Sequence, residues 1–128
     1  MSLPPFDPHG DLPEGLHQTD TTEFFARFGS GTIQRERVAA RLWQVLELVQ
    51  PLGIISRVII WGSFITAKPD PADADILWVT LPVFDRSRLP VQVDVLFIPE
   101  GSAYFATLLD ALSVTRAFTK RGLVEVRL

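Results

Sequence analysis

The chain has 128 residues, a length typical of a single domain, and 47% of them are apolar, enough to form a hydrophobic core. Its 12 lysines and arginines against 15 aspartates and glutamates give a net charge of −3, which argues against non-specific binding to duplex DNA. With no cysteine and only two histidines, the composition excludes disulfides, thiolate metal sites and a three-histidine zinc site. The start does not resemble a signal peptide and no apolar run reaches about 18 residues, so we expect a soluble cytoplasmic protein that does not contact a membrane.

The N-terminal half is predicted to contain an extended arm followed by two helices. Residues 1–13 hold four of the ten prolines, and we expect residues 1–19 to run as a Pro-rich arm over the surface. Asp20 is a favourable N-cap for a short helix over residues 21–28. A longer helix is predicted over residues 33–50, where apolar side chains recur at intervals of three and four residues.

The rest of the chain changes between strand-like and helix-like patterns. The patterns predict strands over residues 57–61, 73–80, 91–98 and 123–128, and a third helix over residues 103–112. Because helices and strands mix along one chain, we expect the α/β (α+β) class, with a small mixed sheet and packed helices in a single domain.

The most informative stretch begins where the first predicted strand ends, at Gly62 and Ser63. A glycine at such a turn lets the backbone approach a ligand closely, and exposed amides together with the Ser63 hydroxyl can bind an anion. Asp73 follows after a gap of nine residues, and Asp73 and Asp75 on a predicted strand project from the same face. Two such carboxylates repel each other unless a cation lies between them, and Mg²⁺ prefers hard oxygen ligands of this kind.

A third carboxylate follows on a later predicted strand. Asp94 lies between two valines, which is an unfavourable place for a lone charge. If its strand is the neighbour of the strand that carries Asp73 and Asp75, the three aspartates form one cluster.

This pattern resembles the core motif of the DNA polymerase beta type nucleotidyltransferase superfamily. In that motif an apolar residue precedes Gly and then Gly or Ser, and Asp-apolar-Asp and a later acidic residue follow. The matching residues are Trp61, Gly62, Ser63, Asp73, Ala74, Asp75, Ile76 and Asp94. The nine-residue gap is at the short end of the superfamily's range. The chain also resembles a family of small bacterial nucleotidyltransferase-like proteins, over segments 3–7, 10–17, 23–29, 62–68 and 120–124.

The resemblance implies an activity and a set of site residues. The three aspartates would hold two Mg²⁺ ions, with Asp94 also helping to activate the acceptor hydroxyl, while Gly62 and Ser63 would cradle the triphosphate. The implied reaction moves a nucleoside monophosphate from an NTP to an acceptor hydroxyl on a protein, an RNA or a small molecule. Two ions about 3.5 to 4 Å apart would stabilise the charge that develops on the phosphate oxygens.

Other side chains have both a functional and a structural interpretation. Lys68 either reaches a phosphate or is a solvated loop lysine, and His17 either acts as a base or packs the arm. Arg35, Arg37 and Arg41 are expected on a solvated helix face rather than at a nucleic acid, because acidic residues are interleaved with them. The tryptophans are expected in the core rather than as stacking platforms for bases: Trp43, Trp61 and Trp78.

The sequence is also compatible with a non-enzymatic function for the same fold. In this alternative the domain is a non-catalytic module, either an antitoxin-like partner of a toxin-like protein or a nucleotide sensor, whose carboxylates hold a metal without turnover. A third interpretation is that Asp73 and Asp75 only cap a solvated loop.

Overall fold

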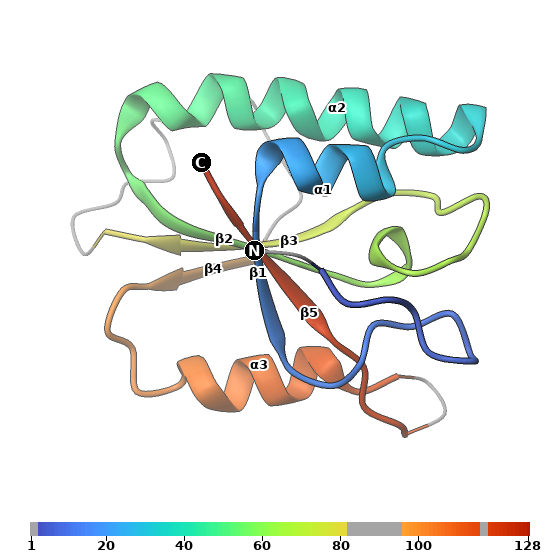
Figure 1. The fold of residues 1–128 in the computed structure, drawn as a ribbon. Coiled ribbons are helices and arrows are strands. Elements are labelled where there is room, and N and C mark those ends of the chain that lie inside the picture. The colour runs from blue at the N-terminus through green and yellow to red at the C-terminus, as the bar shows by residue number, and fades with distance from the viewer. Residues whose placement is uncertain (1–2, 82–95, 116–117) are drawn as a thin grey trace.

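A five-stranded mixed sheet forms the centre of the molecule (Figure 1). The computed structural model describes residues 3–81, 96–115 and 118–128. The strands are β1 (Leu16–Asp20), β2 (Ile55–Trp61), β3 (Asp75–Thr80), β4 (Leu96–Pro99) and β5 (Leu123–Arg127), in the spatial order β1-β5-β2-β3-β4. β1 runs parallel to β5 and β4 parallel to β3, while β2 is antiparallel to both of its neighbours. The last strand of the chain therefore lies inside the sheet.

Helices cover both faces of the sheet. In Figure 1, α1 (Thr21–Phe28) and α2 (Ile33–Val49) lie on one face, and α3 (Phe105–Ser113) lies on the other. Side chains along β2 alternate between the two faces of the sheet. Val58 and Ile60 pack toward α1 and α2, whereas Ile59 packs toward α3. The result is a small single-domain α+β fold, as the mixture of helical and strand patterns predicts.

Local sequence signals account for the two N-terminal helices. The Asp20 side chain accepts a hydrogen bond from the backbone N–H of Glu23 at 2.8 Å, and α1 has the bounds that the sequence predicts. Thr32 caps α2 in the same way, and its hydroxyl accepts from Arg35 N at 3.1 Å. The predicted apolar stripe of α2 faces the sheet, where Val38, Leu42 and Leu46 are buried. A short 3-10 turn, η1 (Gln50–Leu52), follows α2 before the chain enters β2.

The N-terminal arm differs from the prediction because its end joins the sheet. Residues 16–20 form the edge strand β1, and Leu3 and Leu12 are buried in the core beneath α1 and α2. Only the tertiary pairing stabilises β1, since its partner β5 lies more than a hundred residues later in the chain. The arm is therefore part of the packed domain.

Smaller differences concern element boundaries. The structure starts β3 at Asp75 rather than at Asp73, and α3 starts at Phe105 rather than at residue 103. Of the predicted strand over residues 91–98, the part up to residue 95 lies outside the described residues, and β4 accounts for the rest. Within the described part of the chain, no helix combines the length and the apolar character needed to cross a membrane.

Candidate functional site

The turn after β2 is shaped by a backbone conformation that favours glycine. Gly62 has φ +88° and ψ −164°, a region that residues with a Cβ rarely adopt. The chain then forms the short 3-10 turn η2 (Ser63–Ile65), and the Ser63 carbonyl accepts from Thr66 N at 3.2 Å and from the Thr66 hydroxyl at 2.7 Å. Gly62 and Ser63 thus sit at the turn that the sequence predicts, in a fixed conformation.

Asp75 lies directly against this glycine. The antiparallel register of β2 and β3 pairs Trp61 with Asp75, which brings the end of one strand beside the start of the other. A Cβ added to Gly62 would overlap Oδ2 of Asp75 and would lie 3.3 Å from its Cγ. The absence of a side chain at Gly62 therefore makes room for the carboxylate, and the two halves of the sequence motif meet at this point.

A cleft of about 910 Å³ opens beside this contact, and it contains four of the predicted site residues: Gly62, Ser63, Lys68 and Asp75. Its size is within the range of small-molecule sites. The other described lining residues come from the arm, from β2, from the end of α3 and from the turn before β5: Asp7, His9, Asp11, Trp61, Ala111, Leu112, Val114, Thr115, Thr119, Lys120 and Arg121.

The other two predicted carboxylates are placed differently. Asp73 is exposed in the loop before β3, so the strand geometry that predicts two carboxylates on one face applies to Asp75 alone. Asp73 is also absent from the described lining of the cleft. Asp94 lies outside the described residues. Within residues 3–81, 96–115 and 118–128, no three acidic or histidine side chains gather closely enough to hold a metal ion.

Cations and carboxylates alternate along the cleft wall formed by the turn before β5. Lys120 Nζ is 2.7 Å from Asp110 Oδ1 and 3.8 Å from Glu14 Oε1, and the hydrogen bond to Asp110 is the main cause of the raised pKa of Lys120. Arg121 lies 3.5 Å from a carboxylate oxygen of Asp11. The turn before β5 therefore brings positive groups to the cleft, and acidic neighbours hold them in place.

The arm contributes to the cleft through a tight turn over residues 7–11, which the predicted site does not include. One carboxylate oxygen of Asp7 accepts from the backbone N–H groups of His9 at 2.8 Å and Asp11 at 3.0 Å. Gly10, at φ +83°, accepts a hydrogen bond from Ala67 N at 2.8 Å, which ties the arm to the loop after η2. The run Asp7-Pro8-His9-Gly10 is a turn signal that could have identified this corner.

Arg35 of α2 binds the backbone of the loop after η2. The sequence predicts this arginine on a solvated helix face, and that prediction is wrong because the side chain is buried. Its guanidinium is buried and donates to the carbonyls of Phe28 at 3.1 Å, Phe64 at 2.7 Å, Thr66 at 2.5 Å and Lys68 at 2.5 Å. Burial lowers the pKa of Arg35. Three of these carbonyls belong to the segment between Ser63 and Lys68, so α2 fixes one wall of the cleft.

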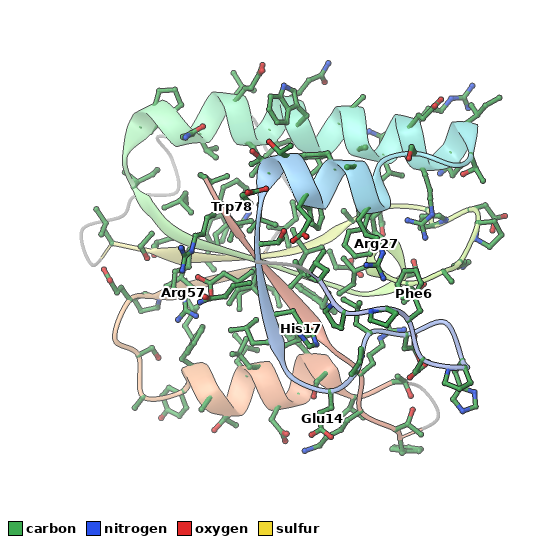
Figure 2. The ribbon with its side chains drawn as sticks, in the orientation of Figure 1. Phe6, Glu14, His17, Arg27, Arg57 and Trp78 are labelled. Atoms are coloured by element: carbon green, nitrogen blue, oxygen red, sulfur yellow. The ribbon has the colours of Figure 1, made fainter. Side chains whose placement is uncertain are left out.

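The other arginines lie where the sequence predicts, and His17 has a structural partner in the arm. Arg37 and Arg41 are exposed on the outer face of α2. His17 Nε2 donates to the Pro13 carbonyl at 2.7 Å, so this histidine packs the arm against the sheet, as its labelled position in Figure 2 shows. Lys68 is exposed, with its backbone N–H bonded to the Thr66 hydroxyl at 3.2 Å.

The three tryptophans fall into three environments. Trp78 is buried between the sheet and α2 (Figure 2), which confirms its expected place in the core. Trp43 is 44% exposed on α2, with its ring edge-on to Phe25 at 5.2 Å between centroids, so its prediction as a core residue is wrong. Trp61 is half-buried and lines the cleft.

Comparison with known proteins identifies a family but no activity. No curated protein and no solved structure matches the chain. The family model DUF6932, described as a family of unknown function, matches residues 4–127. The chain therefore belongs to the DUF6932 family.

Proposed function

We propose that this protein is a metal-dependent nucleotidyltransferase that moves a nucleoside monophosphate from an NTP to the hydroxyl of an acceptor not yet identified. The observation that carries the proposal is the contact between Gly62 and the Asp75 carboxylate at the edge of the cleft. It unites the phosphate-binding half and the acidic half of the motif that resembles the polymerase beta type superfamily.

The cleft offers suitable groups for the triphosphate. The Ser63 hydroxyl lies in the lining of the cleft, directly after Gly62, whose missing side chain leaves room for the Asp75 carboxylate. Lys68, Lys120 and Arg121 supply positive charge around the cleft. Because Lys120 and Arg121 also pair with Asp110 and Asp11, bound Mg²⁺ would supply further positive charge for an anionic substrate.

Asp75 fits the role of a magnesium ligand. Mg²⁺ commonly takes one or two protein carboxylates and completes its coordination with water and substrate phosphates. Asp75 and Ser63 line the same cleft, so Asp75 would hold the ion beside a phosphate bound at Ser63. Asp73 would be a second ligand, as the resemblance implies.

The spacing of the strands supports Asp94 as the third carboxylate. β3 and β4 run parallel, and Leu77 pairs with Leu96 and Trp78 with Phe97, so partners are 19 positions apart. Asp94 follows Asp75 by the same 19 positions in the sequence. The equal spacing is what two neighbouring carboxylates on adjacent parallel strands require, and Asp94 itself lies outside the described residues.

The proposed reaction is a substitution at the α-phosphorus. The acceptor oxygen forms a new bond to phosphorus, the bond from that phosphorus to the bridging oxygen breaks, and pyrophosphate leaves. The hydroxyl proton passes to a carboxylate, for which the resemblance implies Asp94. Bound magnesium would supply charge stabilisation on the phosphate oxygens. The protein's own residues position the triphosphate and provide the carboxylates.

The first prediction concerns binding of NTP and Mg²⁺. A ligand at 100 times its dissociation constant stabilises the folded state by about 2.7 kcal/mol, which raises the unfolding midpoint of a domain of this size by roughly 8 to 15 °C. We expect a shift of this order with NTP and Mg²⁺ together in the wild type. Asp75→Asn should abolish the shift and any release of pyrophosphate, because it removes the carboxylate beside Gly62.

Asp70→Asn is the matched control, because Asp70 is an exposed aspartate of the same loop that is not among the described cleft residues. It should keep the full shift, whereas Asp73→Asn should reduce it. The absence of a shift in the wild type with every NTP would contradict the proposal and favour the antitoxin-like alternative over both the enzyme and the nucleotide sensor. An undiminished shift in Asp75→Asn would contradict the assigned site.

A further inference from the structure

Trp61 lies on the cleft side of the sheet, next to the proposed metal ligand. Within β2, Ile59 and Trp61 pack toward α3, and Trp61 belongs to the same apolar cluster as Leu112 of that helix. Its antiparallel partner across the sheet is Asp75. Side chains of directly opposite residues share a face, with Cβ atoms about 4.5 to 5.5 Å apart. The indole and the Asp75 carboxylate are therefore neighbours.

Apolar residues at the end of α3 line the same cleft as the indole. Ala111, Leu112 and Val114 line the cleft together with Trp61, and Val114 is 40% exposed. Trp61 is only half-buried, in contrast to Trp78, which is 1% exposed in the opposite layer. The core does not cover Trp61 completely, so part of this side chain is available to a ligand.

The chemistry of these apolar residues complements that of the neighbouring turn. Gly62 and Ser63, the residues of the proposed phosphate-binding turn, directly follow Trp61 in the chain. A ligand that spans both places has an anionic group at one end and a flat apolar ring at the other. An indole with aliphatic neighbours suits a planar heteroaromatic ring, because aromatic side chains stack on the faces of nucleobases.

We infer that Trp61, with the end of α3, forms the base-binding subsite of this protein, and that the ligand is a nucleotide whose base stacks on the indole. The inference rests on the proposed function and deepens it, because it assigns the part of the cleft that distinguishes a nucleotide from inorganic phosphates. Stacking depends on contact area, so a purine nucleotide binds more tightly here than a pyrimidine nucleotide.

Intrinsic fluorescence tests the stacking directly. The Trp43→Phe chain removes the exposed tryptophan of α2 and retains Trp61 in the cleft and Trp78 in the core. Titration of this variant with ATP and Mg²⁺ should quench its emission, because a stacked base contacts the indole of Trp61. The Trp61→Phe chain, which keeps Trp43 and Trp78, should lose the quenching.

Affinity measurements separate the base from the phosphates. Trp61→Leu should weaken binding of ATP by about 5- to 150-fold, the range that one stacked base contributes. Binding of tripolyphosphate with Mg²⁺, which lacks a base, should change by less than about twofold. Trp61→Phe retains an aromatic ring and should lose less affinity for ATP than Trp61→Leu. If the leucine variant does not fold, the phenylalanine variant replaces it in this comparison.

The outcomes distinguish this inference from the proposed function. If ATP binds the wild type with Mg²⁺ but Trp61→Leu and Trp61→Phe bind it equally well, the base subsite is overturned and the proposed function stands. Equal affinity of the wild type for ATP and tripolyphosphate would also overturn the subsite. If neither ligand binds the wild type, the result contradicts both the proposed function and the base-binding subsite.

Discussion

At the scale of single residues, the contact between Gly62 and Asp75 sets the geometry of the cleft. A glycine is required for two reasons, since its φ of +88° disfavours other residues and its missing side chain admits the carboxylate. Both requirements apply to the same residue, Gly62 at the end of β2. The site is thus sensitive to the addition of a single methyl group.

Gly62→Ala should therefore lower stability and impair the site together. Strain in this backbone region costs about 1 to 3 kcal/mol, and the overlap with Asp75 adds to it. We expect a lower midpoint in urea unfolding and loss of the stabilisation by NTP and Mg²⁺. Gly53→Ala is the matched control: Gly53 also has a positive φ, +64°, but a Cβ there meets nothing within 4 Å. Equal effects of the two substitutions on ligand binding would contradict the role of the Asp75 contact.

At the scale of elements, α2 supports the cleft from the opposite layer through Arg35. The guanidinium reaches carbonyls at the end of α1, in η2 and in the loop that ends at Lys68. Its planar fork suits several acceptors at fixed angles. The Thr66 and Lys68 carbonyls of the loop after η2 thus accept hydrogen bonds from a helix side chain rather than from the sheet.

Arg35→Gln should destabilise the protein by about 3 kcal/mol, because hydrogen bonds to a charged group are lost and buried carbonyls are left unpaired. Urea unfolding measures the loss directly. Arg37→Gln is the control on the same helix, since Arg37 is exposed, and its effect should stay within about 0.5 kcal/mol. A similar small effect at Arg35 would contradict the anchoring of the loop.

At the scale of the whole molecule, the two ends of the chain are joined in one core. β1 pairs with β5, and the segment before β1 contributes Leu12, which is 1% exposed, to the core. The backbone of Gly122 donates to the Leu12 carbonyl at 2.9 Å. The arm therefore connects the start of the chain to the turn that lines the cleft before β5.

Leu12→Ala should cost about 2 to 5 kcal/mol of unfolding free energy, as expected for a large-to-small change in a packed core. Denaturant unfolding followed by circular dichroism tests this. Leu52→Ala, at a leucine that is 43% exposed, should cost less than about 1 kcal/mol. If both substitutions had the same small effect, the arm would be a surface segment, as the proline content of residues 1–13 predicts.

Local signals account for the elements that the sequence predicts well. The bounds of α1 follow from the Asp20 cap, the buried stripe of α2 follows from its helical periodicity, and the turn at Gly62 follows from glycine at a strand end. These signals act between residues a few positions apart. The presence of Gly62, Ser63, Lys68 and Asp75 in one cleft also agrees with the motif.

The sequence by itself thus determined the mixed α+β class, the helices with clear caps and the turn at Gly62. Only the tertiary structure decided that residues 16–20 form a strand, that Arg35 is buried, and that the arm and the turn before β5 line the same cleft as Gly62. Each of these features depends on a partner far away in the chain. A strand such as β1 is stabilised by hydrogen bonds to another strand, and the burial of a charged side chain depends on which carbonyls the fold brings to it.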